Sequence, residues 1–227
     1  MPDGEHMMVL ALGKTRSLDE PKWFVTPVFT YRYGITDRLD FILAREGAGV
    51  ACTWDRGEAT QLQLRGGLRF GAGGTMVDPA DPDPRQPRTS GPMWMLAPGA
   101  GLTLRHRSSE DTAVLVTVGA NHAVLFNTMA QQSRAWGGVA LLWSPIERVT
   151  LALDLQFNLD RGDPFIGELF GPIVSVGGLH GHTSRAPPIA VRLTQNLDVL
   201  IMPHANWRAR KNDLTYGLLI GIDWHWD

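Results

Sequence analysis

The clearest pattern along this chain is a strict alternation of apolar and polar positions. From Val149 to Asp160 the odd positions hold only Val, Leu or Phe, and the even positions include Asp154, Gln156 and Asn158. Successive side chains of a strand point to opposite faces, so as a strand this segment has one apolar and one polar face. As a helix it would spread its leucines around the whole circumference and bury Asp154. The pattern therefore predicts a long amphipathic β-strand.

The same alternation returns in two other parts of the chain. In the segment 61–70, Leu and Phe alternate with Gln and Arg, and in the segment 214–226 apolar residues fill every second position. Leu219 is the one apolar residue on the other face of that last segment. These segments exceed the usual strand of about 5–6 residues and match the roughly 9–11 that cross a bilayer. They are typical of membrane-spanning strands.

Applied to the whole chain, the pattern predicts about twelve strands. We place them at 6–13, 22–33, 38–47, 49–55, 60–71, 93–107, 111–126, 133–144, 147–159, 186–194, 197–208 and 213–226. An even number is what bacterial single-chain barrels require. The alternation is weakest at 6–13 and 49–55, so ten strands is the alternative. The expected fold is all-β, a closed antiparallel up-and-down transmembrane β-barrel that occupies residues 1–227 as one domain.

The connections between these strands fall into two groups. Four short turns are expected at 34–37, 107–110, 144–147 and 194–196. Two longer connections are the proline- and aspartate-rich segment 75–92 and the segment 161–185, with at most one helical turn at 163–170. All four short turns fall on one side of the barrel and both long connections on the other. Because such barrels have short periplasmic turns, we expect both termini in the periplasm and Thr75 to Pro92 outside.

Three prolines lie inside expected strands, namely Pro27, Pro98 and Pro203. Proline cannot donate a hydrogen bond to the ladder, and a closed barrel has no free edge to accommodate it. We therefore expect a β-bulge at each of the three positions.

Composition narrows the possible functions. The 227 residues carry 21 Lys and Arg against 23 Asp and Glu, so no strongly basic surface for nucleic acid is expected. The mean hydropathy of −0.10 is compatible with a barrel that is apolar on alternate residues only. The single cysteine, Cys52, forms no internal disulfide. The segment 1–5 is polar and the apolar run 7–12 is short, so we expect the export leader of the barrel to be missing from this chain.

The run from Tyr31 to Asp40, Tyr-Arg-Tyr-Gly-Ile-Thr-Asp-Arg-Leu-Asp, resembles a periplasmic turn of bacterial outer-membrane barrels of the channel and transporter-like type. The segments 145–149 and 195–199 look like looser copies of the same hairpin. The resemblance implies the outer membrane of a Gram-negative bacterium, with outer-membrane lipids and the outer-membrane assembly machinery as partners. In that family the assembly machinery reads an aromatic residue at the C-terminus, where this chain has Trp226 before Asp227.

Aromatic residues are expected near the strand ends, where a ring with one wet edge suits a membrane interface. The residues expected in this girdle are Trp23, Tyr31, Tyr33, Trp94, Trp136, Trp207, Trp224 and Trp226. The alternative is the aromatic core of a soluble sandwich. Two faces of opposite polarity along such long strands favour the girdle.

Motifs for enzymatic chemistry are few. The sequence holds no P-loop, no dinucleotide fingerprint and no zinc pattern, so neither a cofactor nor a metal is expected. His180 and His182 alone do not make a metal site. His182 and Ser184 resemble the His-x-Ser pair of outer-membrane phospholipase A and lipid A deacylase barrels, although Arg185 stands where those families have Asn. These two residues are the candidate catalytic pair, and an enzyme is the less favoured interpretation.

Charged residues on the polar strand faces suggest what the barrel does. The charges expected in the lumen are Arg65, Arg69, Arg105, Arg107, Asp154, Asp198 and Asp223. The arginines form a basic wall on the fifth and sixth strands, and Asp198 and Asp223 an acidic wall on the eleventh and twelfth. Such walls orient and select solutes, which favours a narrow pore or passive transporter for small polar solutes. The alternatives are a plugged structural or adhesive barrel, a lipid hydrolase, and a soluble lipocalin-like barrel; the sequence leaves the solute and the oligomeric state open.

Overall fold

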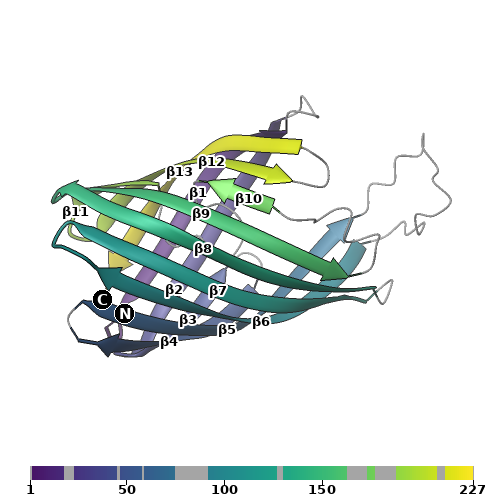
Figure 1. The fold of residues 1–227 in the computed structure, drawn as a ribbon, viewed down its shortest axis with the longest axis horizontal. Helices are drawn as coiled ribbons and strands as arrows, with labels where there is room; N and C mark the ends of the chain where they lie inside the picture. Colours follow the sequence, from purple (N-terminus) through teal and green to yellow (C-terminus); the bar gives the residue numbers. More distant parts are fainter. Residues whose placement is uncertain are drawn as a thin grey trace.

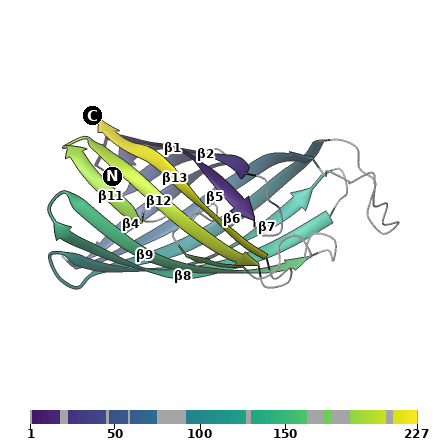
Figure 2. The same cartoon turned by 90° about the horizontal axis from the view of Figure 1, so that it is seen from above.

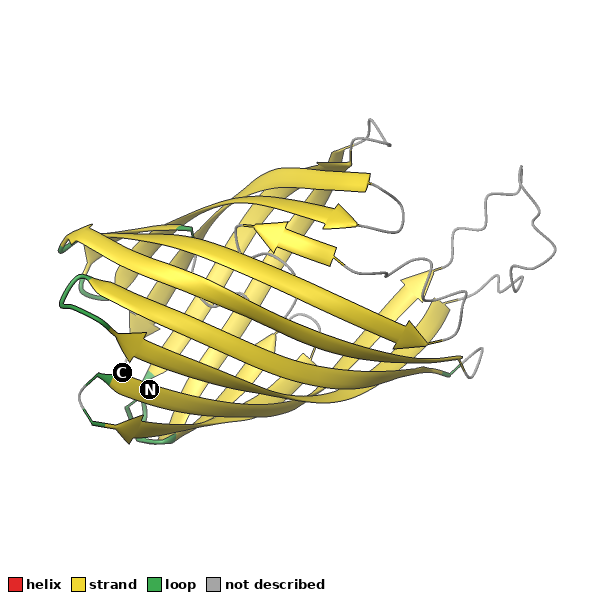
Figure 3. Cartoon of the chain, in the orientation of Figure 1, coloured by secondary structure: helices red, strands yellow, loops and turns green. Residues whose placement is uncertain are grey.

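The structure is a computed structural model that describes residues 2–17, 23–44, 47–57, 59–74, 92–126, 130–162, 173–176, 188–208 and 213–226. These residues form thirteen strands and, within the described part, no helix (Figure 3). The strands are β1 (His6–Ser17), β2 (Trp23–Thr36), β3 (Leu39–Ala44), β4 (Gly47–Arg56), β5 (Thr60–Gly74), β6 (Pro92–Arg107), β7 (Thr112–Leu125), β8 (Ala130–Ile146), β9 (Val149–Gly162), β10 (Ile173–Val176), β11 (Ile189–Thr194), β12 (Leu197–Arg208) and β13 (Asp213–Trp226). In the described segments no helix has the length and apolar content needed to cross a membrane.

Consecutive strands pair antiparallel around one closed sheet, and β1 pairs with β13 to complete it (Figure 1). β10 and β11 share one place in the wall, because each pairs with both β9 and β12. The wall therefore has twelve positions, and the expected closed twelve-strand antiparallel barrel is confirmed.

One strand was not expected. β10 lies inside the segment 161–185, which the sequence pattern marked as a connection. Four residues are too few for a period of two to stand out, and glycine and proline flank them. The segment 163–170, where at most one helical turn was expected, lies outside the described residues.

The barrel has two distinct ends. The turns β2–β3, β4–β5, β6–β7, β8–β9 and β11–β12 gather at one end together with both termini (Figures 1 and 2). We name this the short-turn end. At the opposite, long-loop end lie the other ends of the long strands, among them the end of β5, the start of β6 and the end of β9. The four expected short turns thus do lie together, opposite the strand ends from which both long connections leave.

Alternation along each strand gives the wall its two faces. In β9, Leu153, Leu155 and Phe157 are about half exposed on the outer face, whereas Asp154 and Gln156 are buried on the inner face. The exposed large hydrophobic side chains follow the same rule around the ring, from Leu10 and Leu12 in β1 to Ile220 and Ile222 in β13, and such an outward apolar surface is typical of membrane barrels.

The three prolines sit without the expected bulges. Pro27 and Pro203 lie in uninterrupted register with β1 and β13, and the recorded register shifts lie elsewhere. Each proline instead falls where the ladder on its other side is interrupted. β3 pairs with β2 only from Thr30 onward, beyond Pro27, and the break between β10 and β11 lies opposite Pro203. Pro98 falls in a two-residue gap in the β6–β7 pairing. The backbone N–H that proline lacks costs little stability where no neighbouring strand offers a carbonyl to accept its hydrogen bond.

Candidate functional site

The inner face of the barrel gathers most of the polar and charged side chains of the wall, so it is the candidate site. The register places Arg65, Arg69, Arg105 and Arg107 on this face of β5 and β6. Arg65 is half-buried, and its Nε donates to Oε1 of Gln63 at 2.5 Å. Arg105 and Arg107 are exposed at the short-turn end. The expected basic wall is thus brought together on two adjacent strands.

The three expected acidic residues lie on the same face but in two different settings. Asp198 and Asp223 stand directly opposite each other across β12 and β13 near the short-turn end. Each has a basic neighbour, with Nε of Arg192 3.7 Å from Oδ1 of Asp198 and Nε2 of His225 3.3 Å from Oδ1 of Asp223. Asp154 is fully buried on β9 and accepts a hydrogen bond from Nε2 of Gln156 at 2.6 Å. Arg192 therefore balances part of the acidic charge within its own wall.

An ion pair that sequence reasoning missed lies between β2 and β3. Nε of Arg32 donates to Oδ2 of Asp40 at 3.0 Å, and Nη2 of Arg32 contacts the same oxygen. The Arg32 side chain is 19% exposed and that of Asp40 is 0% exposed. Both residues belong to the turn motif that resembles outer-membrane barrels, and they lie on the face opposite Tyr31 and Tyr33. The strand alternation of that motif was the signal that could have found them.

Apolar residues occupy part of the inner face where the sequence suggested only an acidic wall. Leu200, Met202, Leu219 and Ala11 form a buried cluster on β12, β13 and β1. Val9, Val28 and Ala190 pack against this cluster. In a twelve-position ring, β12, β13 and β1 face β5, β6 and β7. The acidic wall is thus confined to the short-turn end, and above it the arginine side of the barrel faces an apolar patch.

Hydrogen-bonding side chains line the inner face between β9 and β12. Gln156, Asn158, His204 and Asn206 are all buried there. The backbone of β10 runs between these two strands, with residue 175 in register with Gln156 on one side and Asn206 on the other. Such neutral donors and acceptors can replace water around a polar solute.

Trp136 is on the inner face, which corrects its expected place in the girdle. It pairs with Gly119 across β7 and β8, and the outward residues of β8 are its odd-numbered ones, such as Val139 and Leu141. A Cβ at Gly119 would lie 2.3 Å from Cζ2 of Trp136, so the indole ring fills the space above this glycine. Because the apolar outward positions of β8 are odd-numbered, the even-numbered Trp136 could have been assigned to the inner face from the sequence alone.

Four of the expected girdle residues meet on the outer face at the short-turn end. Trp226 stacks on the ring of His6 with 5.2 Å between the ring centroids, and Trp224 lies 4.9 Å from Trp226. Tyr33 lies 4.9 Å from His6, and the hydroxyl of Tyr31 is 2.7 Å from Nδ1 of His6. His6 is the member of this aromatic group that sequence reasoning missed.

Other tryptophans lie elsewhere on the wall. Trp207 is exposed on the outer face toward the long-loop end. Trp54 and Trp143 are exposed on the outer face near the short-turn end, although neither was among the expected girdle residues. Trp23 and Trp94 belong to β2 and β6 close to the long-loop end, and their side chains are not described.

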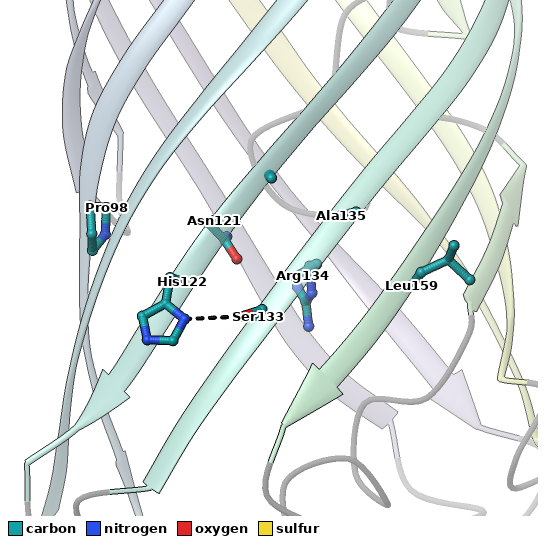
Figure 4. Close-up of a pocket in the computed structure, with 8 residues that line it drawn as sticks. Pro98, Asn121, His122, Ser133, Arg134, Ala135 and Leu159 are labelled. Carbon is teal, nitrogen blue, oxygen red and sulfur yellow. Dashed lines mark hydrogen bonds between the residues drawn. The ribbon is translucent and has the colours of Figure 1, made fainter.

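Among the described residues, the outer face has a hollow of about 560 Å³ near the long-loop end (Figure 4). Pro98, Ala120, Ala135 and Leu159 are among the residues that line it. At its edge Nδ1 of His122 and Oγ of Ser133 are 2.9 Å apart. A His–Ser pair is two-thirds of a hydrolytic triad, but in the described part of the chain the second ring nitrogen of His122 has no partner to orient it.

The candidate catalytic pair of the sequence, His182 and Ser184, lies outside the described residues, as does His180. The described segments hold no group of three or more His, Cys, Asp or Glu side chains arranged to bind a metal ion.

Comparisons with known proteins support this architecture at the level of fold. No family model matches the sequence, and no curated protein is similar to it. An outer membrane channel from Pseudomonas putida superimposes with a TM-score of 0.55 at 12% identity, over 100% of this chain and 97% of that one. A mutant of the TodX monoaromatic hydrocarbon channel reaches 0.52 at 7% identity, over 99% and 91% of the two chains. The outer-membrane-expressed OmpT of Vibrio cholerae reaches 0.51 at 8% identity, over 100% and 99%. At these identities the likeness shows a shared barrel fold.

Proposed function

We propose that this barrel is a narrow pore for the passive passage of small solutes across a bacterial outer membrane. One observation carries the proposal: a closed wall, apolar outside, has an inner face with charged or hydrogen-bonding side chains from the short-turn end to the long-loop end. Water and polar solutes can be solvated along such a face, whereas a soluble ligand-binding barrel has the reverse arrangement.

The membrane location rests on the outer face. Exposed leucine, valine, isoleucine and phenylalanine side chains surround the wall, and the aromatic group of His6, Tyr31, Tyr33, Trp224 and Trp226 marks one end. This arrangement is typical of a wall in contact with lipid and of an interfacial girdle. The shared fold with an outer membrane channel from Pseudomonas putida supports the same location.

Ion selectivity tests the pore. Arg65→Glu combined with Arg105→Glu reverses the charge of two inner-face residues on β5 and β6. In planar bilayers under a salt gradient, we expect the reversal potential to shift toward cation selectivity, because charges along a narrow path set the local ion concentration.

The matched control makes the same charge change outside the path. Arg38→Glu with Arg148→Glu alters two exposed turn residues at the short-turn end and should move the reversal potential much less. An equal shift in both double variants would mean that surface charge, not the inner face, sets selectivity. Folded barrels that give no channel events would contradict the pore and favour the plugged structural barrel.

A further inference from the structure

We infer that Trp136 and Arg65 form a binding step on the inner face for small solutes that combine a flat apolar body with a carboxylate. The inference rests on the proposed pore and specifies which solutes it favours. It is argued from the position of the indole ring, the charges beside it and the wall that faces it.

The indole ring lies against the wall where side chains are missing. A Cβ built at Gly119 would be 2.3 Å from Cζ2 and 2.4 Å from Cε2 of Trp136, and one built at Gly101 would be 3.5 Å from Cζ2. The ring therefore extends from β8 across β7 toward β6, over two glycines. Trp136 is only half-buried, so part of its surface faces the lumen. A ring held in this way offers a stacking surface to a flat molecule.

Cationic side chains flank the ring on both sides. Arg65 of β5 stands directly opposite Gly101 in the β5–β6 register, next to the place that the ring edge reaches. Arg134 lies two residues from Trp136 on the same face of β8. A guanidinium group pairs well with a carboxylate, and Arg65 is oriented by its hydrogen bond to Gln63.

The wall across the barrel carries an apolar patch. Leu219, Met202 and Ala11, with Val28 packed against them, lie on the strands that face β5 to β8. An apolar solute body thus meets hydrophobic side chains on one side and an indole on the other, while its charge meets arginine. Acetate lacks the apolar body, and benzyl alcohol lacks the charge, so benzoate is the suitable probe and these two are its matched references.

The test compares two tryptophans of one strand that face opposite ways. Benzoate, benzyl alcohol and acetate are titrated against the full chain in planar bilayers, and the concentration that halves the current is measured. Benzoate should act at the lowest concentration. Trp136→Leu should raise the half-blocking concentration of benzoate about three- to tenfold, the range expected for one lost aromatic contact. Trp143→Leu, which removes an outward tryptophan from the same strand, should leave it unchanged.

Two more variants separate the ring from the charge. Gly119→Ala places a methyl group where the ring now lies and should raise the half-blocking concentration of benzoate. Gly101→Ala adds its methyl group 3.5 Å from the ring and should raise that concentration less. Arg65→Gln should remove the preference for benzoate over benzyl alcohol. Gel migration with and without heating shows whether each variant is a folded barrel.

The outcomes separate this inference from the pore itself. Channels that conduct normally but respond to benzoate equally in wild type and Trp136→Leu would overturn the binding step and leave the pore intact. If no channel conducts, the pore proposal fails, and equilibrium dialysis of benzoate against the detergent-solubilised barrel decides the binding step. Equal retention of benzoate by wild type and Trp136→Leu would then overturn it as well.

Discussion

At the scale of single residues, the buried pair Arg32–Asp40 ties two strands together on the inner face. Asp40 is inaccessible to solvent and its carboxylate accepts from the guanidinium of Arg32. Removing one member of a buried pair leaves the other charge without compensation, whereas replacing both by apolar residues can be nearly neutral. The pair also joins β2 to β3 within one hairpin of the short-turn end and supports its register.

Asp40→Ala should therefore lower the free energy of unfolding by roughly 3–5 kcal/mol, measured by urea unfolding in detergent micelles. Asp55→Ala, at an exposed residue hydrogen-bonded to Gln61, is the control and should change the stability by less than about 1 kcal/mol. The double variant Arg32→Met with Asp40→Leu should recover most of the loss. An Asp40→Ala barrel as stable as wild type would show that the pair contributes nothing.

At the scale of strands, each proline lies where one neighbouring ladder is interrupted. Pro203 pairs with Leu218 on one side, and on its other side no described strand pairs between the registers of Val176 and Ile189. Pro203→Ala restores a donor that has no ladder to join, so the free energy of unfolding should change by no more than about 0.5 kcal/mol.

Val139→Pro, in the middle of β8, is the contrasting variant. Val139 pairs with Val116 on β7 and Leu155 on β9, so both ladders are complete there. Loss of its N–H leaves a carbonyl without a donor and should cost about 1–3 kcal/mol or more in the same urea assay. Equal stability of the two proline-site variants would reject the ladder explanation.

Because alternation puts apolar side chains on the outer face, a charged residue there should destabilise the barrel, and more so nearer the middle of the membrane. Leu155 lies near the middle of β9 and is 50% exposed, whereas Ile146 lies at the short-turn end. Leu155→Arg should destabilise a lipid-embedded barrel by about 2–4 kcal/mol and Ile146→Arg by about 0–1 kcal/mol, measured by unfolding in lipid vesicles. A similar cost at both positions would argue against a membrane around the outer face.

These strands show what local pattern can and cannot predict. Period-two alternation in the sequence was enough to predict β9 and β13 because each of them alternates over more than ten residues. It missed β10, which has four residues. Trp136 was assigned to the girdle from its expected place near a strand end, although the alternation of β8 puts it on the inner face. The apolar patch around Leu219 includes Ala11 only because β1 becomes the neighbour of β13, and no local period contains that information. The Arg32–Asp40 pair, in contrast, lies within one hairpin and was open to prediction.

At the scale of the whole molecule, the gathering of turns and termini at one end predicts its orientation. We expect the short-turn end in the periplasm and the segment between β5 and β6 outside the cell. A cysteine at Asp81, in a Cys52→Ser background, should react with a membrane-impermeant maleimide on intact cells. A cysteine at Asp37, in the β2–β3 turn, should react only after the outer membrane is disrupted. The reverse pattern of labelling would invert the orientation.

Closure of the wall by β1 and β13 also determines the order in which the barrel can form. His6 pairs with Trp226 and Ser17 with Thr215, so the final ladder joins the two most distant parts of the sequence. Such non-local contacts require the chain to lose its loop-closure entropy before they yield any stabilisation, which makes them slow to form. Until they do, β1 and β13 expose unpaired donors and acceptors, the kind of edge that captures other strands. The rate at which the two end strands meet therefore sets the competition between folding and aggregation for this protein.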